Sequence, residues 1–308
     1  MLQGIFDKLD ALYAEGNNDA VESFLLTTIS VMEGNAEDER SEYVSLLNEL
    51  AGFYRGVSRY AESAEAFSKA LLQMEKHGAS GSPAYAKILL NLAGLFRLMG
   101  DSEQTVTLFL RAKEMLEASE LRDDYAYASV LNNLSLAYQE TGDYDKAYDY
   151  AKQGLDLIRA GAGEEHEVAT ALNNLAAVRI RQKDYDGAEK LVSEALELYK
   201  NMGEENVHHA AALSTYATLL FVKRDYAAAL KNYEASLALT ERFFGQNIEY
   251  ATTERNIAAV YEALGDIDNA LRHGAVALEL LQGILGEEHD RARECKFWLM
   301  KLESRRGK

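Results

Sequence analysis

The amino-acid sequence predicts an all-α protein built as an array of paired helices, and two observations support this. The chain of 308 residues contains one proline and is rich in Ala, Leu, Glu and Lys, a composition that favours helices throughout. A short turn pattern, Gly-Asp-Tyr-Asp-Lys-Ala at residues 142–147, recurs along the chain. Its third residue, the reference position below, is repeated at Tyr60, Ser102, Tyr144, Tyr185, Tyr226 and Ile267. The spacings of 42, 42, 41, 41 and 41 residues indicate a repeat array.

Each repeat is expected to contain two antiparallel helices. The first helix has apolar residues at helical spacing, as in residues 128–140, and the second is amphipathic, as in residues 144–158. Small residues recur three positions after the reference position: Ser63, Thr105, Ala147, Ala188, Ala229 and Ala270. Small side chains let paired helices approach closely, so this column predicts stacked helical hairpins.

The repeat pattern resembles the tetratricopeptide repeat (TPR). Its period exceeds the usual 34 residues by about two helical turns. Together with Leu-Asn-Asn-Leu-Ala at 172–176 and Gly-Glu-Glu-His at 163–166 and 286–289, it is similar to the long repeats of kinesin light chains. The resemblance covers roughly residues 43–300. It implies a right-handed superhelical solenoid of antiparallel helix pairs, forming one domain over residues 1–308.

Six repeats are expected over residues 43–286, with a cap at each end. Residues 1–42 are interpreted as a degenerate capping hairpin over 2–33 that turns at residues 16–19, although Glu22 stands where the other repeats carry a small residue. Residues 287–308 are interpreted as a single capping helix with a tail. Trp298 of that helix is expected to cover the last core. Ser82-Pro83 predicts the start of a first helix, with the serine as its cap.

Composition limits the function classes. Hydrophobic residues make up 48% of the chain, which provides for a core. The formal net charge of −18 argues against general nucleic-acid binding. The single cysteine, Cys295, can form no internal disulfide, which suits a reducing compartment. With no long apolar segment and no basic leader, we expect a cytoplasmic protein that does not insert into membranes.

Asparagines recur inside the predicted first helices. Eleven residues before the reference position stand Asn91, Asn133, Asn174 and Asn256, and twelve before stand Asn48, Asn132 and Asn173. Asparagine costs about 0.5 kcal/mol against alanine in a helix, so its recurrence needs a reason. The resemblance implies that these columns face a concave groove, where an amide can pair with a peptide's N–H and C=O groups. Two interpretations stay open: a ladder that binds peptide backbone, or amides that bond neighbouring repeats.

The ladder alone would bind weakly. Four amide contacts give about 2–6 kcal/mol, whereas association costs about 4–15 kcal/mol. Other groove positions must therefore contribute. Arginines and a lysine at these positions are candidates for contacting an acidic side chain or a terminal carboxylate, or for ordinary ion pairs within the protein: Arg55, Lys87, Arg97, Arg181 and Arg255. Leu136, Ile180, Phe221 and Val222 are candidates for an apolar stretch.

No catalytic or metal-binding pattern is present in the sequence, and no cofactor is expected. The histidines mostly fall near the openings of first helices, and Cys295 is expected to be a buried, inert thiol. Arg179 occupies a position that is aromatic in other repeats, so we expect it to be paired or to reach solvent.

The sequence thus predicts a non-enzymatic module that binds an extended or helical peptide segment of a partner protein. One alternative is a scaffold that self-associates through its ends, because residues 1–42 carry a net charge of −8 and residues 287–308 a net charge of +2. Another is a regulator acting in trans on an enzyme or transcription factor. The sequence does not identify the partner.

Overall fold

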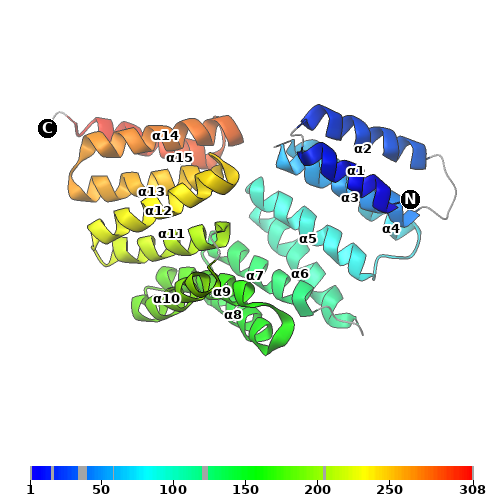
Figure 1. Cartoon of the computed structure of the whole chain (residues 1–308), viewed down its shortest axis with the longest axis horizontal. Helices are drawn as coiled ribbons and strands as arrows, with labels where there is room; N and C mark the ends of the chain where they lie inside the picture. Colours follow the sequence, from blue (N-terminus) through cyan, green and yellow to red (C-terminus); the bar gives the residue numbers. More distant parts are fainter. Residues whose placement is uncertain are drawn as a thin grey trace. The chain divides into compact units, whose positions relative to one another are not determined.

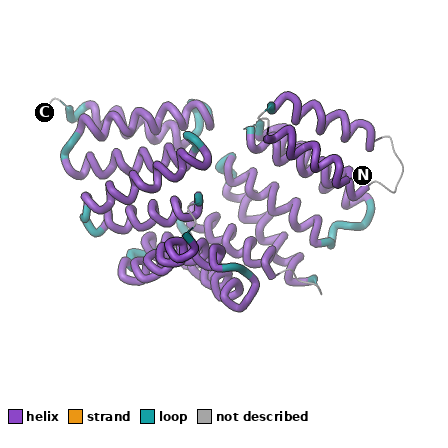
Figure 2. The backbone as a smooth tube through the Cα atoms, viewed as in Figure 1, coloured by secondary structure: helices purple, strands orange, loops and turns teal. Residues whose placement is uncertain are grey.

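The computed structural model describes residues 2–14, 17–33, 40–57, 59–119, 124–203 and 206–306. Within these ranges the chain forms α-helices and no strand (Figures 1 and 2). The chain divides into unit 1, Met1–Thr141, and unit 2, Gly142–Lys308. The two units are not placed relative to one another, so the predicted single superhelical domain stays a prediction.

Unit 1 contains seven helices among its described residues: α1 (Leu2–Ala14), α2 (Asn18–Glu33), α3 (Arg40–Gly56), α4 (Tyr60–Lys76), α5 (Pro83–Leu98), α6 (Ser102–Ala118) and α7 (Asp124–Glu140). The described part of unit 2 contains α8 (Tyr144–Leu157), α9 (Glu165–Arg181), α10 (Tyr185–Met202), α11 (Val207–Val222), α12 (Tyr226–Phe244), α13 (Ile248–Leu264), α14 (Ile267–Leu285) and α15 (Asp290–Glu303). A π-helical turn, Ile158–Ala162, follows α8.

All six reference positions are the first residues of second helices, α4, α6, α8, α10, α12 and α14, as the repeat predicts. Their local sequence explains why. In five of them the preceding residue is an aspartate whose carboxylate accepts a backbone N–H of the first turn: Asp101, Asp143, Asp184, Asp225 and Asp266. The residue before that aspartate has a positive φ, which glycine adopts without strain at Gly142 but which Lys183 and Arg224 also adopt.

Within each unit, a second helix packs against its own first helix and against the next one. Within unit 1, α4 contacts α3 and α5, and within unit 2, α12 contacts α11 and α13. The small residues three positions after the reference position are buried at these contacts, and the hydroxyl of Ser63 donates to the carbonyl of Ala51 at 2.7 Å. Successive first helices also touch: α3 with α5, α5 with α7, α9 with α11, and α11 with α13. Each unit therefore presents adjacent first helices on one side.

The predicted helical hairpin at the amino-terminal end is present as α1 and α2, while Gly16 of its predicted turn lies outside the described residues. Glu22 replaces the expected small residue because it accepts hydrogen bonds from Tyr54 at 2.9 Å and from Arg59 at 2.7 Å. Ser82 caps α5 by accepting the backbone N–H of Tyr85, as expected.

The single helix expected at the other end is α15, and Trp298 packs against the last core cluster, as predicted. Seven residues after the reference position, the second helices carry Phe67, Phe109, Ala151, Val192, Tyr233 and Gly274. A Cβ atom on Gly274 would lie 2.5 Å from a ring carbon of Trp298. The cap therefore supplies the bulk that α14 lacks at this position.

Candidate functional site

In unit 1 the first helices α3, α5 and α7 line a cavity of about 670 Å³. Five of the residues predicted to bind a peptide line it together: Arg55, Lys87, Asn91, Arg97 and Asn133. They come together because α3 touches α5 and α5 touches α7, so residues about 42 apart in sequence share one side of the unit.

The asparagines of unit 1 have different partners. The amide nitrogen of Asn91 donates to the side-chain oxygen of Asn48 at 2.9 Å, joining two successive first helices. The amide nitrogen of Asn133 instead donates to the backbone carbonyl of Ser129 at 2.9 Å, one turn back in its own helix. The side-chain oxygen of Asn132 is buried and has no hydrogen-bond partner within the described residues. One amide pair thus links repeats, which matches the structural interpretation, while the side-chain oxygens of Asn91 and Asn133 keep the capacity to accept.

The cationic residues around the cavity also differ. Arg97 forms an ion pair with Glu140 at 2.9 Å, although its Nε atom is buried and unpaired within the part of the chain that the structure describes. Arg55 is half-buried and makes one long hydrogen bond, 3.4 Å, to the backbone carbonyl of Asn91. Burial lowers the pKa of Arg55, and within the described ranges no carboxylate opposes this effect. Burial raises the pKa of Glu49, and the nearby Lys87, which is exposed, opposes this only in part.

The predicted site residues of unit 2 do not gather in one cavity. Asn173 is buried with its side-chain oxygen unpaired among the described residues, and Asn174 is half-buried without a hydrogen bond there. Asn256 and Arg255 line a cavity of about 330 Å³. The guanidinium of Arg255 stacks 3.7 Å above the ring of Trp298. Arg181 is exposed on α9.

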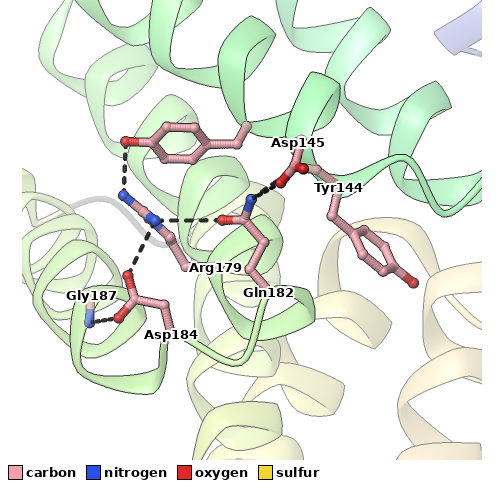
Figure 3. Close-up of polar contacts among 7 residues, drawn as sticks. Tyr144, Asp145, Arg179, Gln182, Asp184 and Gly187 are labelled. Atoms are coloured by element: carbon pink, nitrogen blue, oxygen red, sulfur yellow. Dashed lines mark hydrogen bonds and ion pairs between the residues drawn. The ribbon is translucent and has the colours of Figure 1, made fainter.

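Arg179 is paired, as the sequence led us to expect (Figure 3). Its guanidinium donates to the Tyr148 hydroxyl at 2.8 Å and lies 4.0 Å from the centre of that ring. It also forms an ion pair with Asp184 at 3.3 Å, and the side chain of Gln182 extends the contacts to Asp145. This arginine therefore joins α9 to α8 and stabilises the turn that starts α10.

The remaining titratable groups show packing or capping contacts. The thiol of Cys295 is buried, which raises its pKa, and it lies 3.8 Å from the carbonyl of Gly274. His209 stacks on Tyr199, and His289 caps α15. Across the described ranges no three His, Cys, Asp or Glu side chains gather as a metal site would require. Where the structure describes the chain, its helices are too short or too polar to span a membrane.

Sequence reasoning missed a repeated polar cluster in unit 1. A tyrosine at the start of each first helix donates to a glutamate ten residues earlier: Tyr43 to Glu33 at 3.1 Å, Tyr85 to Glu75 at 2.5 Å and Tyr127 to Glu117 at 2.5 Å. A lysine or arginine of the neighbouring second helix lies over each ring: Lys69, Arg111 and Lys113. The signal was the ten-residue Glu–Tyr spacing, which recurs every 42 residues.

Comparison with known proteins agrees with this architecture. A family model described as "Tetratricopeptide repeat" matches residues 42–118, 126–201 and 208–294. Among functionally curated proteins, none matches the chain in sequence.

Several solved structures are similar. The apo form of RapI is 14% identical, with a TM-score of 0.74 over 92% of this chain and 98% of that chain. BtubC (BKLC) from P. vanneervenii is 24% identical, with a TM-score of 0.52 over 77% and 93%. Nearly identical TPR-like repeats ascribed to a kinesin light chain of Podosopora anserina are 17% identical, with a TM-score of 0.56 over 65% and 96%. These similarities concern the fold, and the family match covers most of the sequence. The chain belongs to the tetratricopeptide repeat family.

Proposed function

We propose that this chain is a non-enzymatic protein-binding module whose unit 1 cavity holds an extended or helical segment of a partner protein. Tetratricopeptide repeats are generally interaction modules, because stacked helical pairs present a long surface on which a chain can lie. The proposal goes further by assigning the cavity between α3, α5 and α7 to the partner.

The observation that carries this proposal is the half-buried guanidinium of Arg55 beside two asparagine amides. Within the described part of the chain Arg55 makes no ion pair, so its charge has lost water without gaining an anion. A partner carboxylate would supply that anion through paired N–H donors. Asn91 and Asn133 line the same cavity, and their side-chain oxygens can accept N–H groups of the partner backbone.

Estimated energies support a division of roles. A hydrogen bond to a charged group contributes about 1.5–3 kcal/mol, against about 0.5–1.5 kcal/mol for a neutral one. Since Asn91 already donates to Asn48, the amides supply only part of the binding free energy. The carboxylate contact with Arg55 would therefore decide which peptides bind, and the asparagines would orient the backbone.

A random peptide library displayed on phage and selected on the whole chain tests this proposal. We expect enriched peptides to carry an acidic residue or to depend on a free terminal carboxylate. Fluorescence anisotropy should then show that Arg55→Gln weakens binding about tenfold and Asn133→Ala several-fold. Lys231→Gln, an exposed cation on α12, is the matched control. Failure to enrich any peptide, or binding that ignores Arg55, would contradict the assignment.

Self-association through oppositely charged ends has less support. Arg305 pairs with Glu262, and Arg306 pairs with Asp268 at 2.7 Å, so part of the terminal basic charge is neutralised within unit 2. Light scattering across a salt series tests this alternative, because a salt-independent monomer would exclude it. Nothing in the described part of the chain favours regulation in trans over simple binding.

A further inference from the structure

Unit 2 contains a second cavity, of about 620 Å³, formed by α11, α12 and α13. None of the residues that the sequence predicted to bind a peptide lines it. Its lining is dominated instead by hydroxyl groups: Ser214, Thr215, Ser236, Thr240, Thr252 and Thr253. The other polar lining residues are His208, Asn247 and Glu249.

Five of these hydroxyls already donate a hydrogen bond within the protein. Each donates to a backbone carbonyl at 2.7–3.0 Å: Thr215 to Ala211, Ser236 to Ala210, Thr240 to Ser236, Thr252 to Ile248 and Thr253 to Glu249. A hydroxyl has one proton and two lone pairs, so these groups can offer a ligand only acceptor sites. The surface therefore favours a ligand rich in N–H donors.

The charge of the cavity points to the same class of ligand. Glu249 is exposed and forms no ion pair within the described residues. Partial desolvation of the ring and the nearby His166 lower the pKa of His208, which favours its neutral form. The carboxylate of Glu249 is then the only charge among the lining residues, and it attracts a cation.

The chain itself shows how a cation uses this surface. The guanidinium of Arg291 donates to the hydroxyl oxygen of Thr252 at 2.6 Å, while that hydroxyl donates to Ile248. Arg291 thus occupies one of the acceptor sites. The hydroxyl oxygen of Thr215 and the carboxylate of Glu249 keep their acceptor sites.

We propose that this cavity binds the guanidinium of an arginine side chain from a basic segment of a partner protein. A planar guanidinium carries five N–H donors and no acceptor, so it matches the hydroxyl lone pairs and the Glu249 carboxylate of this cavity. The site is independent of the unit 1 cavity, since it shares no residue with it and takes the opposite charge.

The test uses two short peptides, N-acetyl-Gly-Arg-Gly-amide and its citrulline counterpart, which keeps the shape but is uncharged. Each is titrated into the isotope-labelled whole chain, and binding is followed by NMR chemical shifts. We expect the arginine peptide to bind about tenfold more tightly, with shifts centred on α11 and α13. The binding should weaken as salt concentration rises.

Two variants locate the site. Glu249→Gln should weaken the arginine peptide about tenfold, and Thr215→Val, which keeps the side-chain shape, about threefold. Glu234→Gln, an exposed acid on α12 outside the cavity, is the matched control and should leave binding unchanged. Thermal melts verify that each variant is folded, and Glu249→Gln alone suffices if Thr215→Val is not. Equal binding of the two peptides, no binding of either, or no effect of Glu249→Gln would overturn the proposal. Because neither peptide carries a carboxylate, the result is independent of the acidic-peptide selection on unit 1.

Discussion

The hydrogen bond between Asn91 and Asn48 leads to a quantitative prediction. Asn91 of α5 donates to Asn48 of α3 at 2.9 Å, and both side chains are half-buried. Asn174 occupies the same repeat position in α9 but forms no hydrogen bond among the described residues. Substituting each with alanine separates an amide that bonds a neighbouring repeat from one that does not.

The structure sets the expected magnitudes. Loss of a neutral hydrogen bond costs about 0.5–1.5 kcal/mol, while alanine returns about 0.5 kcal/mol through its higher helix propensity. Asn91→Ala should therefore lower the free energy of unfolding by up to about 1 kcal/mol. Asn174→Ala removes no hydrogen bond among the described residues, so it should raise the free energy of unfolding by about 0.5 kcal/mol. The two substitutions, although chemically identical, should act in opposite directions.

Urea denaturation followed by far-UV circular dichroism measures both effects. A double-mutant cycle with Asn48→Ala and Asn91→Ala isolates the amide pair, with an expected coupling energy of about 0.5–1.5 kcal/mol. Coupling below about 0.3 kcal/mol, the usual error of additivity, would refute the inter-repeat bond. A loss in Asn174→Ala equal to that in Asn91→Ala would show that the two positions have the same environment.

Three further predictions follow from packing and charge. Gly274→Ala should lower the melting temperature, because overpacking against Trp298 costs about 1–3 kcal/mol and the higher helix propensity of alanine offsets only about 1 kcal/mol. Combining Gly274→Ala with Trp298→Phe should recover part of the loss. A higher melting temperature in the single variant would contradict this packing. Tyr85→Phe removes a charged hydrogen bond to Glu75 and should lower the free energy of unfolding by about 1–3 kcal/mol in urea denaturation; an unchanged midpoint would argue against the contact. Burial raises the pKa of Glu49, so stability falls as the pH rises past the ordinary glutamate pKa, and the loss is complete above the folded pKa. Glu49→Gln should therefore stabilise the chain at pH 7 and lose this advantage below about pH 4, near the ordinary pKa of glutamate; melts at both pH values check it, and an equal gain at both would be inconsistent with the pKa shift.

The sequence predicted the helices of the repeat because their determinants are local and periodic. Asp143 caps a helix through contacts within one turn, and Gly142 supplies the positive φ of the preceding turn. Ala147 is small because the paired helices approach closely there, and the equivalent residue of every pair is small for the same reason. Such requirements recur at 41–42 residues, so one well-marked repeat is enough to align the others.

The cap contacts were harder to predict because each depends on a partner distant in sequence. Glu22 departs from the pattern of small residues. Its carboxylate accepts hydrogen bonds from Tyr54 and Arg59, which are more than 30 residues away in the sequence. Gly274 likewise lacks the side chain that the other repeats carry at its position, because the ring of Trp298 in the next helix fills that space. The repeat pattern marks such positions as exceptions, but only the packed structure identifies what compensates for them.

Candidate site chemistry shows the same limit, since the repeat predicts where a side chain lies and not what it bonds. Asn91, Asn133 and Asn174 share one column, yet one bonds a neighbouring helix, one its own helix, and one nothing in the described chain. At the same position in α11, the hydroxyl of Thr215 already donates to the carbonyl of Ala211, so it can only accept a hydrogen bond from a ligand. Unit 1 therefore offers the charged donors of Arg55 beside amide acceptors, whereas the hydroxyls of unit 2 offer acceptors beside a carboxylate, although the helices are equivalent. Because the two cavities carry opposite charges, Arg55→Gln should weaken only the binding of an acidic peptide, and Glu249→Gln only the binding of a basic one.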